Sequence, residues 1–111
     1  MRTVFEFRKA GWLCDEVFGV LRRHRAAVCF ADWPMPDFHQ PVTADFVYIR
    51  RHGYGQLYGG SYPDSHLGGD AKRIRGWLED GLDVFVYFNN DTLGHAVLNA
   101  LTLKGMLARG R

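Results

Sequence analysis

Hydrophobic and polar positions alternate between the spacing of strands and the spacing of helices along the chain. Positions 3–8 have period two, which predicts a strand whose polar members Glu6 and Arg8 share one face. Positions 12–24 carry apolar residues at helical spacing, with acidic residues first and basic residues last, which complements a helix dipole. The short apolar run 27–32 predicts a second strand, because the prolines that follow prevent its continuation.

The middle of the chain combines a third strand with a long loop. Residues 37–44 have no strong period and predict a loop or a single turn of helix. Residues 45–52 predict a strand, with Arg50 and His52 on one face. In the following segment 53–62 four glycines alternate with three tyrosines, which is typical of a functional loop.

The last part of the chain predicts helix, strand and helix. Asp64 or Ser65 is expected to cap the first helix, and adjacent glycines weaken its first turn, so its firm part is expected near Asp70. Residues 83–90 predict a fourth strand, and Asp91 is expected to begin the final helix. The apolar stripe of that helix consists of Leu93, Ala96, Val97, Ala100 and Leu101.

This alternation predicts an α/β fold with four parallel strands, in which right-handed crossovers place every helix on one face of the sheet. A doubly wound sheet would need strongly apolar strands throughout. Here the strands become polar toward their C-terminal ends, as they do at the mouth of a TIM-type (β/α)₈ barrel. Such barrels need about 250 residues. The 111 residues form a single partial barrel domain, and we expect a second copy or a separately encoded N-terminal half to complete it.

Composition excludes several classes of protein. The hydrophobic content of 47% is sufficient for a core, and no apolar run approaches the roughly 20 residues of a membrane helix. The formal charge of +2 has no long basic run, so nucleic-acid binding is only weakly supported. Cys14 and Cys29 form no CxxC motif, which indicates a reduced, cytoplasmic protein. No GxGxxG, P-loop, GxSxG, HExxH or EF-hand spacing occurs, and we expect no cofactor and no metal.

Glu6 and Asp32 are candidate catalytic carboxylates. They end adjacent strands, which lie about 4.8 Å apart in a sheet, so both could reach one substrate. Paired carboxylates suit hydrolysis of glycosides or phosphoesters. The alternative, of about equal weight, is a charge network in which Glu6 and Arg8 neutralise each other.

Arg50 and His52 give the clearest indication of chemistry. Their spacing makes them face the same way, and the pair could hold an anion and move a proton near neutral pH. Arg51 points to the opposite face, where it is expected in solvent or in the helix layer.

Two further groups could bind a ligand. Asn89, Asn90 and Asp91 join the last strand to the last helix, where barrels often bind phosphate, although a cap or turn role is the alternative for some of them. Tyr58 and Tyr62 could close over a ligand, or could pack the loop down.

The chain resembles the domain of unknown function 72, or YecE-like, family. The resemblance spans nearly the whole chain and lies in Glu6-Phe-Arg8 with Trp12, Asp32, Tyr48-Ile-Arg-Arg-His-Gly53, Tyr58-Gly-Gly-Ser-Tyr62 and Asp83-Val-Phe-Val-Tyr-Phe-Asn-Asn-Asp91 with Gly94, Ala96, Asn99 and Ala100. It implies a cytoplasmic TIM-type barrel of which this chain covers strands five to eight. Where the family tends to have a Trp-Ala pair, this chain has Gly69-Asp70-Ala71.

The leading functional hypothesis is binding of a small polar or anionic metabolite. Arg8 and Arg50 are the expected anchors, and Glu6, Asp32 and His52 are the candidate acid/base groups for hydrolytic chemistry. One alternative is a non-catalytic half-barrel that acts through assembly with a partner chain. Another is a protein associated with single-stranded nucleic acid, in which arginines contact phosphate and tyrosines stack on bases.

Overall fold

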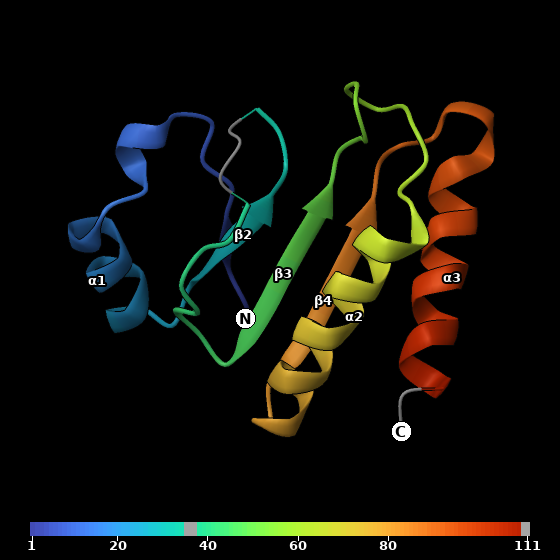
Figure 1. Ribbon diagram of the computed structural model, residues 1–111. Coiled ribbons are helices and arrows are strands. Elements are labelled where there is room, and N and C mark those ends of the chain that lie inside the picture. The colour runs from blue at the N-terminus through green and yellow to red at the C-terminus, as the bar shows by residue number, and fades with distance from the viewer. Residues whose placement is uncertain (35–37, 110–111) are drawn as a thin grey trace.

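The computed structural model describes residues 1–34 and 38–109, which form one parallel sheet with a layer of helices (Figure 1). The four strands are parallel and lie in the order β1-β2-β3-β4, so the predicted α/β fold is confirmed. The elements are β1 (Val4–Phe5), the 3-10 turn η1 (Ala10–Trp12), α1 (Asp15–Arg23), β2 (Ala27–Ala31), β3 (Phe46–Arg51), α2 (Asp64–Glu79), β4 (Asp83–Phe88), the 3-10 turn η2 (Thr92–Gly94) and α3 (His95–Arg109).

The ends of the early elements differ from the prediction. β1 is limited to the two residues that pair with β2, Val4 with Ala27 and Phe5 with Val28. The helix expected over 12–24 begins only at Asp15, after the separate turn η1. The described residues between β2 and β3 contain no helix, which supports the loop alternative; Pro36 lies outside the described residues.

The helices share one face of the sheet, and the core lies between the two layers. Phe18 and Leu21 of α1, and Ala71 and Ile74 of α2, pack into one cluster with Leu103 of α3. The side chains on the helix-facing side of the sheet also belong to this cluster, namely Val28, Phe30, Val47 and Ile49. The strand period therefore sends alternate residues into this core and the others to the opposite face.

That opposite face has no helix over it in the described part of the chain. The register places Cys29, Tyr48 and Phe85 side by side, followed by Ala31, Arg50 and Tyr87. The rings of Tyr48 and Tyr87 lie 5.1 Å apart between centroids. Phe85 and Tyr87 are exposed, so this face is apolar in its middle and polar where the strands end.

α2 corrects two expectations. It is helical from Asp64 onward, and Pro63 precedes it as the N-cap without any side-chain cap from Asp64 or Ser65. Asp70 lies well inside the helix, where it is buried and paired with Arg51. Arg51 is thus in the helix layer, and the solvent alternative for it is wrong.

α3 buries a different set of residues from the predicted stripe. Ala96 is buried, but Leu93, Val97 and Leu101 are 86%, 65% and 60% exposed. The helix instead turns Asn99 and Leu103 toward the protein. Asp91 precedes the turn η2 and makes no side-chain cap. None of the described helices combines the length and the apolar character that crossing a bilayer requires.

Candidate functional site

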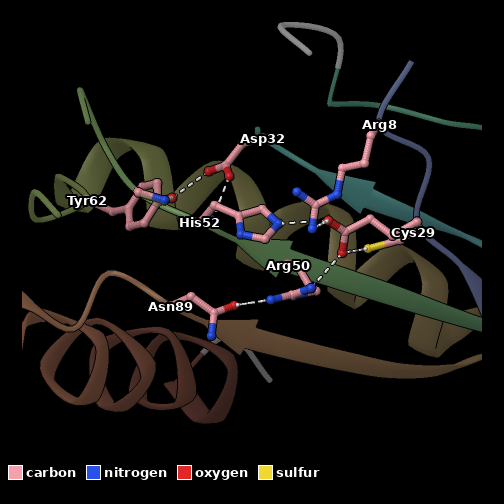
Figure 2. Close-up of polar contacts among 9 residues, drawn as sticks. Arg8, Cys29, Asp32, Arg50, His52, Tyr62 and Asn89 are labelled. Atoms are coloured by element: carbon pink, nitrogen blue, oxygen red, sulfur yellow. Dashed lines mark hydrogen bonds and ion pairs between the residues drawn. The ribbon is translucent and has the colours of Figure 1, made fainter. Parts of the chain in front are cut away.

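Glu6 is the centre of a polar cluster at the C-terminal ends of the strands. Figure 2 labels its partners Arg8, Cys29, Arg50 and His52. Its carboxylate accepts a hydrogen bond of 2.8 Å from Nη1 of Arg50 and lies 3.0 Å from Nε2 of His52. Nη2 of Arg8 lies 3.4 Å from the same carboxylate, and Sγ of Cys29 donates to it across 3.7 Å. The sequence prediction that Glu6, Arg8, Arg50 and His52 share one face is confirmed by these contacts.

Burial and charge act in opposite directions on Glu6. Burial raises the pKa of the carboxyl, but the hydrogen bond from His52 and the positive charge of Arg50 together lower it below its ordinary value. The neighbouring thiol responds to the same carboxylate. Burial and then the charge of Glu6 raise the pKa of Cys29 to about 12. Glu6 is therefore ionised and Cys29 is protonated at neutral pH.

His52 follows β3 directly and is 1% exposed. Because an ionised carboxylate only accepts hydrogen bonds, Nε2 donates to Glu6, and Nδ1 is the ring nitrogen that would hold the lone pair in the neutral form. Nδ1 is buried and has no hydrogen-bond partner in the described part of the protein. The ring of Tyr58 packs edge-on against the imidazole, with the centroids 6.2 Å apart. This arrangement gives His52 the orientation of a general base with an unused acceptor.

Asp32 holds the backbone on the other side of His52. Its carboxylate accepts a 2.7 Å hydrogen bond from the backbone N–H of His52 and a short one from the hydroxyl of Tyr62. The Tyr62 hydroxyl in turn accepts the N–H of Gly53 at 3.0 Å. Burial and the bond to Asp32 raise the pKa of Tyr62, which keeps this hydroxyl protonated as a donor.

Glu6 and Asp32 thus occupy different environments. His52 is bonded to both, through its ring to Glu6 and through its backbone to Asp32. Nη1 of Arg51 also lies 3.6 Å from Asp32, on the helix side of the sheet. This geometry favours Glu6 as the group nearest a ligand and Asp32 as a positioning residue.

Asn89 extends the cluster to β4. Its side-chain oxygen accepts hydrogen bonds from Nε and Nη2 of Arg50, at 3.3 and 3.1 Å. Its backbone N–H donates to the carbonyl of Arg51 at 2.8 Å, which fixes the residue beside β3. The guanidinium of Arg50 is therefore held between strands β1 and β4.

Asn90 has a different role from Asn89. It is fully buried, and its amide donates to the Gly60 carbonyl and to Oδ1 of Asn99, both at 2.8 Å. The same Oδ1 accepts the backbone N–H of Tyr62 at 3.1 Å. These bonds attach the loop 53–62 to α3, so Asn90 fixes the position of this loop and has no direct contact with Glu6 or His52 among the described hydrogen bonds.

The remaining predicted residues lie at the surface. Asp91 is exposed. Tyr58 is half exposed and has φ of 60°, a left-handed backbone conformation that non-glycine residues rarely adopt. Thr92 donates its hydroxyl to the Tyr58 carbonyl at 3.1 Å, which helps to hold this conformation.

Sequence reasoning missed three supporting residues. Cys29 was not among the candidate site residues, yet it contacts Glu6. The strand register indicates this contact, because Val4 pairs with Ala27 and a step of two residues along each strand leads to Glu6 and Cys29. Asp70 pairs with Arg51. The position of Arg51 on the helix-facing side of β3 could have indicated that a carboxylate on a helix pairs with it. The role of Asn99 could not be predicted from hydrophobic periodicity.

The described residues include no group of three or more His, Cys, Asp or Glu placed to hold a metal ion.

Comparisons with known proteins place these features in a family context. A family model described as "Protein of unknown function DUF72" matches residues 1–111. No curated protein matches the chain. A DUF72 family protein from Enterococcus faecalis V583, solved at 3.10 Å, is similar with a TM-score of 0.78 and 21% identity over 95% of this chain and 46% of that one. Another from Thermotoga maritima MSB8 has a TM-score of 0.70 and 25% identity over 97% and 46%. The chain spans about half the length of these solved relatives.

Proposed function

The chain belongs to the DUF72 family, and we propose that its strand ends bind a small anionic ligand on which the Glu6–His52 pair performs acid/base chemistry. The observation that carries this proposal is the convergence of Glu6, Arg50 and His52 from the ends of β1 and β3. Function at the C-terminal ends of parallel strands is the usual arrangement in barrels built this way.

Charge supports an anionic ligand. Arg8 and Arg50 both face Glu6, so the cluster around this carboxylate has an excess of positive charge. A guanidinium has five N–H donors, so Arg50 can hold Glu6 and Asn89 and still donate to a ligand. Arg8 is largely exposed and can turn toward a bound anion. Phosphate and carboxylate both match the planar fork of arginine.

Proton transfer is the role that the orientation of His52 supports. With Nε2 fixed on Glu6, Nδ1 is the ring atom left to remove a proton from a water molecule as that water attacks an ester of the bound anion. Because Nδ1 is buried, this step requires a rearrangement that admits water to it. The protonated ring is stabilised by the Glu6 carboxylate and can then return the proton to the leaving oxygen. This sequence amounts to hydrolysis without a covalent intermediate. Both cysteines are free, which suits a cytoplasmic location for this activity.

Binding can be tested by adding inorganic phosphate to the ¹⁵N-labelled chain and following its amide resonances. We expect saturable shifts at Arg50, His52, Gly53 and Asn89. Arg50→Gln should weaken binding about tenfold, because it removes one charge-assisted contact. Arg73→Gln, on the surface of α2, is the matched control and should leave the affinity unchanged. The absence of saturable shifts at these four amides would contradict the proposed ligand class.

Catalysis requires a separate measurement. Hydrolysis of p-nitrophenyl phosphate should be detectable with the unaltered chain and lost in His52→Asn, while the phosphate-induced shifts persist in that variant. If His52→Asn hydrolyses the ester as fast as the unaltered chain, the acid/base role is wrong even though the binding role stands.

A further inference from the structure

We propose that two copies of this chain close into one eight-stranded barrel, in which β4 of each copy pairs with β1 of the other. This inference concerns the edges and the open face of the sheet and does not depend on the proposed ligand. Its starting point is that the ends of the sheet, β1 and β4, each have a single neighbour in the described structure. Free strand edges are sites where further strands add.

The open face of the sheet supports closure. Parallel sheets are stable when both faces are covered, yet here Phe85 and Tyr87 of β4 are exposed on the side opposite the helices. Tyr48 of β3 is partly exposed beside them. In a closed barrel, such side chains fill the interior together with those of the other strands. The aromatic character of this face fits a barrel interior better than it fits solvent.

One edge carries an apolar helix surface. Val97 and Leu101 are four residues apart on α3, so they share a face, and both are mostly exposed. Leu93 and Leu98 add exposed apolar surface nearby. Figure 1 shows α3 at the end of the helix layer beside β4, with no further element beyond it. We call the four residues the α3 edge.

The other edge carries an apolar groove of about 340 Å³ between β1 and α1. Its lining contains no Asp, Glu, Lys or Arg side chain, and Trp12 and Val20 within it are exposed. Figure 1 places α1 at the end of the helix layer opposite to α3. We call this surface the α1 edge; its lining is Phe5, Phe7, Trp12, Val17, Val20, Leu21, His24 and Ala26.

A second copy is the occupant that fits both edges at once. The α3 edge of one chain can contact the α1 edge of the other, and a two-fold axis then makes the same contact again on the far side. Four strands from each copy give the eight of a closed (β/α)₈ barrel. The length of two copies agrees with that of one solved relative, because the chain covers 46% to 48% of each relative. Two copies therefore restore the amount of chain that one relative contains.

The first test is the mass of the purified chain in sedimentation equilibrium. We expect a particle of twice the 12.7 kDa of one chain. The double variants Val97→Glu/Leu101→Glu and Trp12→Glu/Val20→Glu, one on each edge, should sediment as folded monomers. Leu78→Glu, on the central helix α2 and about as exposed as Val20, should remain a dimer. Circular dichroism confirms folding of each variant, and all the altered side chains are exposed.

Mixing the two double variants distinguishes edge-to-edge closure from packing of α3 against α3. In a mixed dimer, one interface carries both sets of charges and the other is unaltered, so some dimer should return on mixing. If α3 packs against α3, the α1-edge variant stays dimeric by itself. That result, or larger open-ended assemblies, would overturn the proposal. A chain that is monomeric or unfolded at every concentration would overturn it as well and would favour a different partner, such as a separate N-terminal half.

Discussion

Nε2 of His52 lies 3.0 Å from Oε2 of Glu6, and this contact connects β3 to β1 across the intervening strand β2. Neighbouring strands lie about 4.8 Å apart, so the ends of β1 and β3 are separated by roughly twice that distance. Only long side chains that face the same side can bridge such a gap. Arg50 makes a second bridge to Glu6, at 2.8 Å. The strand ends are thus held together by side chains in addition to the backbone ladder.

The first prediction concerns Glu6 and pH. Because the folded pKa of Glu6 is lowered, its carboxylate stabilises the fold above the ordinary value of 4.5, and this stabilisation is lost as the pH falls through the lowered value. Glu6→Gln should reduce the free energy of unfolding at pH 7 by about 1–3 kcal/mol, since Arg50 and His52 lose a charged acceptor. The difference should shrink in urea denaturation series performed below pH 4.5.

Glu79→Gln is the control for this series, since Glu79 is exposed at the end of α2. Its stability should follow that of the unaltered chain at each pH. A constant difference between Glu6→Gln and the unaltered chain down to the most acidic stable condition would show that the ionised state of Glu6 does not contribute.

The second prediction concerns the ion pair between Arg51 and Asp70. Both groups are buried, and Nε and Nη2 of Arg51 each contact one oxygen of Asp70. Asp70→Asn should lower the free energy of unfolding by about 3 kcal/mol, because it removes the nearer of the two carboxylates that pair with the buried guanidinium and leaves only Asp32, at 3.6 Å. Asp80→Asn, at the exposed end of the same helix, should change it by less than about 0.5 kcal/mol. Equal effects of the two substitutions in urea denaturation would contradict this account.

The third prediction concerns the thiols. Burial and the Glu6 carboxylate raise the pKa of Cys29 to about 12, whereas Cys14 is exposed. A disulfide reagent such as dithionitrobenzoate should therefore label one thiol per native chain quickly and the other only after unfolding in urea. Cys14→Ser should abolish the fast phase. Rapid labelling that persists in the native Cys14→Ser variant would mean that Cys29 is accessible.

The fourth prediction compares two glycines. Gly60 has φ of +75°, and a Cβ there would lie 1.8 Å from the Tyr54 carbonyl oxygen, so Gly60→Ala should destabilise the loop by about 2 kcal/mol. Gly68 lies within α2 with nothing within 4 Å of an added Cβ. Gly68→Ala should therefore stabilise the protein by roughly 0.5–1 kcal/mol. Urea midpoints that move in the same direction for both variants would be inconsistent with these environments.

The sequence predicted those features that depend on local periodicity. Strand spacing alone placed Arg50 and His52 on one face, and the strand order brought Glu6 to them. The loop over 53–62 followed from its glycines. In each of these cases the information lies within a few adjacent residues or in the regular geometry of a parallel sheet.

Other features depend on contacts between distant segments and could not be predicted. Asn90 and Asn99 meet only because α3 packs back against the end of β4. The continuous helix through Gly68 is stabilised by tertiary packing, which outweighs the low helix propensity of glycine. The stripe containing Val97 has the period of a buried face, yet this surface is exposed. Periodicity identifies an apolar face but not the surface that covers it.

The hydrogen bonds of Asn99 have a thermodynamic consequence. This side chain stands on α3, the helix proposed to contact a second copy, and it accepts the backbone N–H of Tyr62 in the loop beside the candidate site. A displacement of α3 on assembly would therefore move a hydrogen-bond acceptor of the loop that packs on His52. Linkage is reciprocal, so any factor by which assembly tightens anion binding must equal the factor by which the anion tightens assembly. The oligomeric equilibrium could then serve as a sensor of ligand concentration.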